Sequence, residues 1–538
     1  MVRRRRGFWG VGLLGACLVF WASCAFGAPT TGEQALKAAR NWAAAGARLG
    51  EKTSSGAGTV ASYRDGKGQV LFHVVRLGAG TVILPGDDRV EPILAFLPEG
   101  SYDDRTDNPL RALVRRDLKG RFAVLTSGGA SEKGAGEGNE TKWRRLESGR
   151  QAEGGVGGVS DVRVAPLVAS RWNQAEAYSG GPLCYNLYTP ENLVCGCVAT
   201  AMAQVMYTHR HPAAGVGTPS FPIRVNGVDQ TRALRGGDGA GGPYDWDAMV
   251  AVPGPGITSA SCQAIGALTH DAGVAAKMRY SSAESGTGTE DARDALVGAF
   301  GYGNAVMGFS GAYGTNVPGS VLRAMVNPNL DAGYPVLLGL TQTSDGSGHE
   351  IVCDGYGYEA GTGYHHLNLG WSGASDAWYN LPNIDAAIPF DVVDDLCYNI
   401  FVSGTGEIVS GRVLDGAGNP VAGATVTAAG GGRTFTDLTD SKGVFALPQV
   451  PSGVTYTLTS SAGGARTVAV GVSQNGAAST GNVWNVLLGT APDPSPTLTV
   501  TPLPTRRPSS GGGGCAALGF LPLLALVVLP LAALRRRG

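Results

Sequence analysis

The chain has 538 residues, too many for one ordinary domain, and a formal net charge of −1 at pH 7. Because 42 basic residues nearly balance 43 acidic ones, the chain has no basic field for nucleic acid and no acidic tail. Glycine is the outlier, with 84 residues, and indicates short strands, tight turns and flexible connections rather than helical bundles.

Residues 1–27 have the pattern of a secretory signal peptide. A basic segment, Arg3 to Arg6, precedes a short apolar run, and small residues follow at Ala25 and Gly27. Cys24 imitates a lipoprotein cleavage site, but Trp21 stands where a Leu-like residue is expected, so we expect ordinary cleavage near Gly27. The alternative, a retained membrane helix, is less favoured because the apolar run is short. The pattern predicts an exported protein.

Residues 28–126 form the first unit that we expect to fold. The segment 31–49 is helical in period and composition, and two later runs alternate like strands. Residues 127–158 then have the polar, charged and Gly-rich composition of an exposed linker. Within it, "WRRLESGRQ" is a target for proteolysis. The sequence therefore predicts a separate N-terminal unit on a cleavable linker.

Residues 159–404 form the largest expected unit. Helical patterns come first, at 192–212 and 289–302, and several strand-like runs close the unit after residue 334. Helices followed by an antiparallel sheet predict an α+β domain.

The last part of the chain changes composition twice. Residues 405–490 are short alternating strands with regularly spaced turn residues, which predicts a small all-β sandwich. Residues 491–514 are rich in Pro, Thr, Ser and Gly and predict a stalk without a core. Residues 515–538 begin with an uncharged stretch long enough to span a bilayer and end in three arginines, which predicts a membrane segment.

The exported body of the chain retains six cysteines. This is not the density of a disulfide scaffold, so we expect at least one thiol to serve another purpose. The sequence does not give their pairing. They are Cys184, Cys195, Cys197, Cys262, Cys353 and Cys397.

One interpretation of the stretch 192–212 is a metal site. Cys195, Cys197, His209 and His211 supply four competent ligands in roughly the order of a zinc finger. However, the residues between Cys197 and His209 contain no Gly or Pro and favour a helix, over which these two residues would lie about 18 Å apart. A zinc site therefore requires a break in this helix.

The other interpretation makes Cys197 a nucleophile at the start of that helix. The free N–H groups there stabilise a thiolate, lower its pKa and can also stabilise the oxyanion of an acyl-transfer intermediate. A buried or disulfide-bonded cysteine remains the structural alternative.

A nucleophile needs a base, and His349 is the best-placed histidine. It follows Gly346 and Gly348 and enters a strand, as a base opposite a helix-borne cysteine does. Asn368, on the next expected strand, can accept the imidazole N–H and fix the tautomer. The alternatives are a strand-start histidine and a turn-forming asparagine. Together, Cys197, His349 and Asn368 have the order of a papain-type triad.

Several segments, in order, resemble the streptopain family of papain-like cysteine peptidases. They are "SRWNQ", "GCVATAMAQVMYTHRHP", "DAGVAAKMRYSSAESGTG", "GSGHEIVCDGYG" and "YHHLNLGWSG". The resemblance covers most of residues 160–404 and implies a papain-like α+β domain. It also implies that Cys197 is the nucleophile, His349 the general base and acid, and Asn368 the residue that orients the imidazole.

The same resemblance implies supporting residues. The backbone N–H groups of Cys197 and Val198 would line the oxyanion hole, with Gln174 as a further positioning residue. The loop 281–288 with Gly286, and also Gly348, would flank the bound peptide.

The sequence departs from the family at Leu369, where a Trp usually follows the Asn, although Trp371 matches the second Trp of the pattern. Loss of an indole that shields the His–Asn bond predicts weakened activity, unless Trp371 substitutes for it. Cys195 is also unusual beside the nucleophile. A bridge to Cys184 and a reversible oxidation lock with Cys197 are the two alternatives for it.

The flanking parts carry resemblances of their own. "VILPGDDRVEPILAFLPEG" resembles the prodomain of the same family, which implies that residues 28–126 block the cleft until the linker is cut. "SGRVLDGAGNPVAGATVT" resembles carboxypeptidase regulatory-like domains, which are spacers or binding platforms. The C-terminal "GGGGC", apolar span and arginines resemble bacterial sorting tails, which implies Cys515 as an attachment point; a plain membrane anchor is the alternative.

The sequence thus predicts an exported, surface-displayed cysteine endopeptidase made as a zymogen, which needs no cofactor or metal. Its expected partners are protein or peptide substrates, its own prodomain as inhibitor, and the membrane through the C-terminal tail. Two alternatives stay open: an inactive surface adhesin or peptide-binding protein on the same fold, and a zinc-binding surface domain.

Overall fold

The structure is a computed structural model. It describes residues 29–44, 58–78, 80–126, 138–149, 161–282, 284–309, 317–341, 348–359, 361–382 and 393–490. The expected signal peptide, stalk and C-terminal tail lie outside the described residues, as does the separate unit Asp493–Gly538. In the part of the chain that is described, no helix is both long and apolar enough to cross a membrane.

The N-terminal unit is an antiparallel meander with two helices. Its elements are α1 (Gly32–Ala44), β1 (Gly58–Arg64), β2 (Val70–Leu77), β3 (Gly80–Pro85), β4 (Ala95–Leu97) and α2 (Pro109–Thr126). Thr31 and Gln34 begin α1 with a capping box, in which each side chain accepts from the other's backbone N–H. The buried Ala35, Ala38, Ala39 and Trp42 then form one apolar stripe at helical spacing.

Helix α3 (Asn139–Ser148) differs from the exposed linker expected at 127–158. Its Trp143 is 1% exposed and donates its indole N–H to the carbonyl oxygen of Val90 at 3.0 Å. The helix also packs against α1. The polar composition hid it because the helix buries few side chains besides this indole. The remaining linker residues lie outside the described part of the chain.

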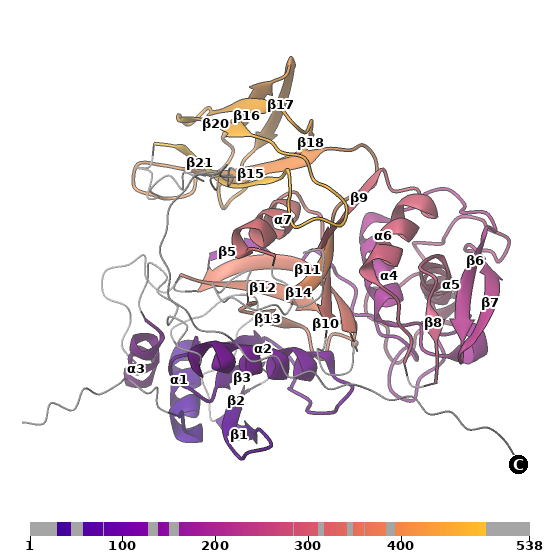
Figure 1. Cartoon of the computed structure of the whole chain (residues 1–538), viewed down its shortest axis with the longest axis horizontal. Coiled ribbons are helices and arrows are strands. Elements are labelled where there is room, and N and C mark those ends of the chain that lie inside the picture. The colour runs from indigo at the N-terminus through magenta and orange to yellow at the C-terminus, as the bar shows by residue number, and fades with distance from the viewer. Residues whose placement is uncertain are drawn as a thin grey trace, which may run out of the picture. The chain divides into compact units, whose positions relative to one another are not determined.

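The helical half of the central domain surrounds α4 (Cys197–His209). Around it lie η1 (Pro190–Asn192), β6 (Ser220–Val225), β7 (Val228–Ala233), α5 (Ser259–Ala275), β8 (Arg279–Tyr280) and α6 (Thr289–Gly298). Helix α4 is buried from Val198 to Met206, which fits its continuous run of apolar and small residues. In Figure 1, α4, α5 and α6 lie together beside strands β10 (Val336–Thr341) and β14 (Val393–Phe401), with which α6 makes contact.

The other half of the domain is an antiparallel sheet with one helix. Its further elements are β5 (Asp161–Val164), β9 (Asn304–Phe309), α7 (Gly319–Asp331), β11 (Gly348–Glu359), β12 (Thr362–Asn368) and β13 (Ala377–Tyr379). The strand order is β13-β12-β11-β10-β14-β9, and β5 pairs with β11. The predicted α+β class, with a papain-like arrangement of helix and antiparallel sheet, is confirmed.

The sheet does not stop at β13. Strand β4 of the N-terminal unit pairs with it, Phe96 opposite Trp378 and Ala95 opposite Tyr379, so that in the described residues eleven strands form one sheet. Trp42 and Phe96 share a buried cluster with Tyr364 and Trp378. The N-terminal unit is therefore joined to the central domain by backbone hydrogen bonds and by a common core.

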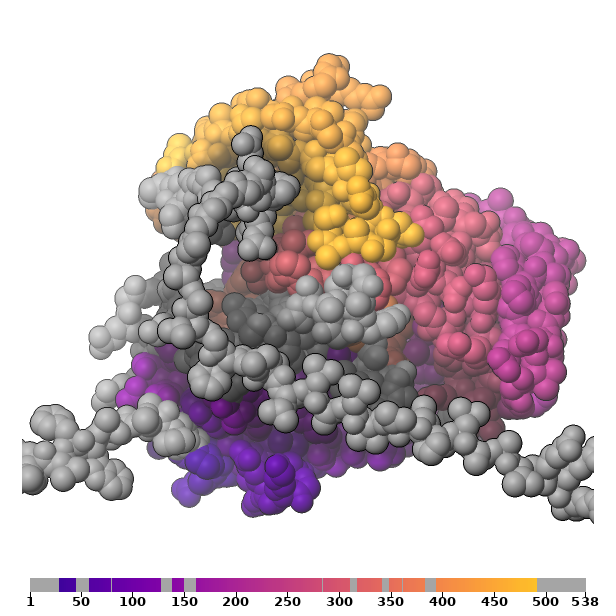
Figure 2. Space-filling model, viewed as in Figure 1, coloured from indigo at the N-terminus to yellow at the C-terminus, as the bar shows by residue number. Residues whose placement is uncertain are grey.

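The C-terminal domain is a two-sheet sandwich. Its strands are β15 (Glu407–Leu414), β16 (Thr425–Gly430), β17 (Arg433–Leu438), β18 (Val444–Val450), β19 (Thr455–Ser460), β20 (Ala465–Ala469) and β21 (Val483–Gly489). One sheet has the order β18-β15-β21 and the other β17-β16-β19-β20. In Figure 2 the sandwich is the body at the orange-to-yellow end of the colour scale. The predicted all-β sandwich is confirmed.

Candidate active site

Cys197 lies where the sequence places the nucleophile, at the first residue of α4. The preceding Gly196 has φ of 90°, and a side chain there would bring its Cβ within 2.7 Å of the carbonyl oxygen of Ser285. Only glycine fits this turn without strain. Of the six described cysteines, Cys197 alone is partly exposed, and the other five are buried. Its thiol is thus the one that a peptide can reach.

The start of β11 meets the start of α4. The backbone N–H of Glu350 donates to Cys197 Sγ at 3.4 Å, so the residue directly after His349 contacts the nucleophile. The strand β11 also packs along α4. Two residues 153 positions apart along the chain are therefore brought together at one edge of the helix–sheet interface.

His349 is oriented by a backbone group. Its Nε2 lies 3.0 Å from the carbonyl oxygen of Leu369. A carbonyl oxygen can only accept, so Nε2 carries the hydrogen and Nδ1 keeps its lone pair. That tautomer is the one a general base needs at Nδ1.

Asn368 does not orient His349, which corrects the expected triad. Its Nδ2 donates to the carbonyl oxygen of Ser170 at 2.7 Å, and its Oδ1 accepts from Gln204 Nε2 at 3.1 Å and from the Gly370 N–H at 3.2 Å. The side chain is buried and fully engaged in holding α4 to the sheet.

Strand register explains this correction. Asn368 stands opposite Val352 on β11, and directly opposed side chains share a face. His349 lies three positions before Val352, so its side chain leaves the other face. The register therefore turns the Asn368 amide toward α4, and the next carbonyl, that of Leu369, reaches the imidazole.

Burial dominates the electrostatics of the pair. Burial raises the pKa of the Cys197 thiol, and backbone N–H groups of Glu350 and Val198 lower it only in part. Burial lowers the pKa of His349 to about 4, although the bond to Leu369 raises it in part. The N–H groups of Cys197 and Val198 at the start of α4 lower the thiol pKa as expected, but burial outweighs them.

Cys195 forms neither of the expected bridges. All six described cysteines are free thiols. Cys195 is fully buried, and its Sγ lies 3.3 Å from Thr200 Oγ1. Its backbone N–H donates to the carbonyl oxygen of Gln174 at 2.9 Å. This cysteine thus fills space beneath the turn that carries the nucleophile.

The remaining expected site residues surround Cys197 at different depths. Val198 is buried, with its backbone N–H against Cys197 Sγ, and Gln174 is half-buried, tied through its carbonyl to Cys195. Gly286 exchanges two backbone hydrogen bonds with Arg279 at the edge of the loop beside Gly196.

Two further expected residues lie near His349 along the chain. Gly348 is exposed directly before it. Trp371 follows Leu369 by two residues and is half-buried, and its ring lies beneath the guanidinium of Arg105, 5.4 Å from the ring centroid.

The zinc interpretation required a broken helix. Helix α4 runs unbroken from Cys197 to His209, so these two residues stand at opposite ends of it. His209 instead lies 3.2 Å through Nδ1 from the hydroxyl of Tyr302. The four residues Cys195, Cys197, His209 and His211 therefore cannot share one ion.

Comparison with known proteins finds two family matches along the chain. Residues 172–379 match the Peptidase C10 family. Residues 408–488 match the carboxypeptidase regulatory-like domain. The relatives that this chain resembles are cysteine peptidases. The identity to each of them is low.

Three relatives illustrate the match. The chain is 22% identical to streptopain of Streptococcus pyogenes over 356 residues, 63% of this chain and 79% of streptopain. It is 24% identical to the thiol protease/hemagglutinin PrtT of Porphyromonas gingivalis over 382 residues, 70% of this chain and 41% of that protein. A solved fragment of Prevotella intermedia prointerpain A is 21% identical, with a TM-score of 0.48, and the match covers 64% of this chain and 99% of the fragment.

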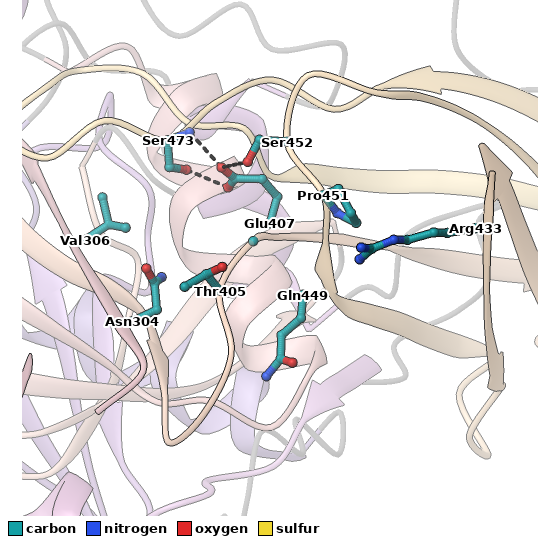
Figure 3. A pocket seen from close by; sticks show the side chains of 10 residues that line it. Asn304, Val306, Thr405, Glu407, Arg433, Gln449, Pro451, Ser452 and Ser473 are labelled. Carbon is teal, nitrogen blue, oxygen red and sulfur yellow. Dashed lines mark hydrogen bonds between the residues drawn. The ribbon is translucent and has the colours of Figure 1, made fainter. Parts of the chain in front are cut away.

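A pocket of about 460 Å³ lies away from this site, between the end of the central domain and the sandwich (Figure 3). At its floor the Glu407 carboxylate accepts from Ser452 Oγ at 3.1 Å and from the backbone and hydroxyl of Ser473 at 2.7 and 2.6 Å. The acid is already satisfied by these donors. The pocket is lined by Asn304, Val306, Thr405, Gly406, Glu407, Arg433, Gln449, Pro451, Ser452 and Ser473.

Sequence reasoning missed two participants. The Leu369 carbonyl carries no side-chain signal, because any residue at that position supplies the same oxygen. Gln204 does carry one, as an amide seven positions after Cys197 on a helix whose neighbouring residues are mostly small or apolar. Its side chain links Ser170, Trp172 and Asn368.

Proposed function

We propose that this protein is an exported cysteine endopeptidase made as a zymogen. The observation that carries the proposal is the contact between the start of α4 and the start of β11. There a partly exposed thiol at a helix N-terminus meets the backbone beside a histidine whose tautomer is fixed by Leu369. The match to a family of cysteine peptidases over residues 172–379 supports it.

The geometry suggests the following reaction. The lone pair of His349 Nδ1 takes the proton of Cys197 as its sulfur attacks the carbonyl carbon of a peptide bond. Backbone N–H groups of Cys197 and Val198 stabilise the oxyanion. The imidazolium then protonates the leaving amine, which leaves a thioester. A water molecule, deprotonated by the imidazole, hydrolyses the thioester and restores the thiol. Gly286 and Gly348 would flank the peptide, and Trp371 would act as a positioning residue.

Contacts of the N-terminal unit support its role as an inhibitory prodomain. Arg105 stacks over Trp371, and Glu99 pairs with Arg171 at 3.5 Å. Both Trp371 and Arg171 lie within segments that resemble the peptidase family. Cleavage in residues 127–137 or 150–160, outside the described part, would cut the covalent link between this unit and the enzyme. Export and surface attachment rest on residues 1–27 and 515–538.

One observation favours the alternative of a peptide-binding protein with little activity. Burial raises the pKa of the Cys197 thiol, and a neutral thiol is a weak nucleophile until the base removes its proton. Peptide hydrolysis separates the two functions, because a binding protein leaves the bound peptide intact.

The test is intact-mass analysis of residues 28–510 in a thiol reductant, beside Cys197→Ala. We expect the parent to be cut between residues 127 and 160 into two fragments, which the mass spectrum separates, and the variant to stay whole. An epoxide inhibitor of thiol proteases should add to the parent alone. If neither chain is cut and Cys197 stays unmodified by the epoxide, the peptidase proposal is overturned.

A further inference from the structure

Two acids face each other across three strands beside the nucleophile. Glu350 on β11 and Asp395 on β14 both stand opposite Gly339 on the intervening strand β10. Directly opposed residues share a face, so both carboxyls project on the side covered by α6. There the hydroxyl of Thr289, the first residue of α6, lies 2.7 Å from Glu350 Oε2 and 2.7 Å from Asp395 Oδ1. We call Glu350 and Asp395 the acidic pair.

Gly339 leaves the space that the acidic pair occupies. A Cβ at this position would lie 1.9 Å from Asp395 Oδ1 and 3.0 Å from Thr289 Oγ1. Any other residue at position 339 would therefore displace the Asp395 carboxylate from its place beside Thr289. The glycine keeps the two acids directed at a common point.

The acidic pair adjoins the reacting thiol. The backbone N–H of Glu350 donates to Cys197 Sγ. The Glu350 side chain therefore starts at the Cα next to the amide that contacts the nucleophile. The Ser285 carbonyl lies against Gly196, the residue before the nucleophile, and the buried Ser285 hydroxyl has no hydrogen-bond partner within the part of the chain that is described. The backbone of Glu350 therefore connects the acidic pair to the nucleophile.

The acidic pair lacks a cation among the described residues. Glu350 is 5% exposed and Asp395 is 6% exposed, and Glu350 Oε1 has no hydrogen-bond partner. Thr289 has one hydroxyl proton, so its contacts with two carboxyls require one of them to hold a proton. Burial, followed by the neighbouring Asp395, raises the pKa of Glu350 well above its usual value. A buried acid in this state gains most from a ligand that brings positive charge.

We propose that Glu350 and Asp395 form an acidic subsite that receives the cationic side chain of a Lys or Arg residue in the peptide substrate. The inference rests on the proposed peptidase function and names its substrate class, peptides with a basic residue next to the scissile bond. A guanidinium has five N–H donors and can bond Glu350 Oε1 and Asp395 together. The chain between the two units contains basic residues that such a subsite could accept, among them Lys133 and Arg150, although an equal number of glutamates balances their charge.

The test compares peptide substrates that differ in one side chain. Fluorogenic peptides carry Arg or its uncharged counterpart norleucine at the first or the second residue before the scissile bond. We expect the processed parent to prefer Arg in kcat/KM by roughly tenfold or more at one of these positions. Glu350→Gln and Asp395→Asn should each reduce this preference, the ratio of the Arg to the norleucine kcat/KM, to about threefold or less.

A matched control comes from the same strand. Glu359, at the far end of β11, is also a buried acid, and burial raises its pKa to about 7. Glu359→Gln should leave the preference for Arg unchanged. Epoxide titration of Cys197 in each variant reports whether the site is folded. If Glu350→Gln does not fold, the comparison of Asp395→Asn with the parent still tests the acidic subsite.

The outcomes separate this inference from the proposed function. A parent that cleaves norleucine peptides without preferring Arg overturns the acidic subsite and leaves the peptidase standing. A preference that persists in both variants also overturns it. A parent that cleaves neither peptide and does not react with the epoxide overturns the peptidase, and this inference with it.

Discussion

The Nε2 atom of His349 lies 3.0 Å from the carbonyl oxygen of Leu369. The bond is made by the backbone, so the change from Trp to Leu at position 369 does not remove it. The Leu at this position lacks the indole of a Trp, but its backbone carbonyl still accepts from His349 Nε2 and fixes the imidazole tautomer. The departure at Leu369 therefore does not by itself indicate a dead enzyme.

Replacing Asn368 should cost stability more than activity. Asn368→Ala removes hydrogen bonds to Ser170, Gln204 and Gly370, and we expect a loss of about 1–3 kcal/mol in the free energy of unfolding. Below the melting temperature, kcat/KM should fall less than roughly tenfold, whereas His349→Ala should lower it about 1,000-fold. Thermal melts and peptide hydrolysis measure both. A 1,000-fold loss in a folded Asn368→Ala protein would show that the amide acts on the imidazole.

Asp376 positions Leu369 from the other side. Its Oδ1 accepts the Leu369 N–H at 3.0 Å. Asp376→Ala should let the carbonyl drift from His349, so kcat should fall by roughly tenfold while KM changes little. Asp376→Asn keeps an acceptor oxygen and should recover most of the rate. Steady-state kinetics of the two variants decide this, and equal losses in both would contradict a positioning role.

The order of elements along the chain was sufficient to predict the fold class. Helical patterns precede strand patterns, and the small-residue run after Cys197 could only be a buried helix. Asn368 failed as an orienter because a sequence does not give strand register, and one residue of register decides which face an amide leaves. For the same reason the sequence did not predict that Glu350 and Asp395 lie close together, because they do so only through strand register, with both residues opposite Gly339. Helix α3 was missed because Trp143 is nearly its sole buried anchor.

The acid limb of the pH–rate profile should report a buried histidine. Burial lowers the pKa of His349 to about 4, so the imidazole stays neutral and able to accept a proton down to about pH 5. We expect kcat/KM for a norleucine peptide to hold between pH 7 and 5 and to fall below that.

The same shift predicts a loss of stability in acid. The unfolded chain takes up the His349 proton near pH 6.5 and the folded chain only near pH 4, so the contribution to folding shrinks as pH falls between these values. Melts across this range allow activity to be compared only where the protein is folded. An acid limb near pH 6.5 in folded protein would contradict the buried, neutral imidazole.

Removing Arg105 should loosen the zymogen. Its guanidinium stacks over Trp371, a contact of about 0.5–1 kcal/mol at an exposed site. In the uncut chain, Arg105→Ala should therefore raise the rate at which an epoxide labels Cys197 by about two- to fivefold. Arg64→Ala, an exposed arginine on β1 that bonds only its own turn, is the control and should leave the rate unchanged. Equal labelling of all three chains would show that this contact does not guard the cleft.

Cutting the chain between the units should not by itself release the N-terminal unit. Strand β4 pairs with β13, and Phe96 packs against Trp378 and Tyr364. Separation would expose this shared core, so we expect the cut halves to elute together in gel filtration and to part in denaturant. Phe96→Ala, which should cost about 3–5 kcal/mol of packing, should release the unit without denaturant. Val60→Ala, on the partly exposed outer strand β1, should not. Free separation of the unmodified halves would mean that the continuous sheet does not hold them.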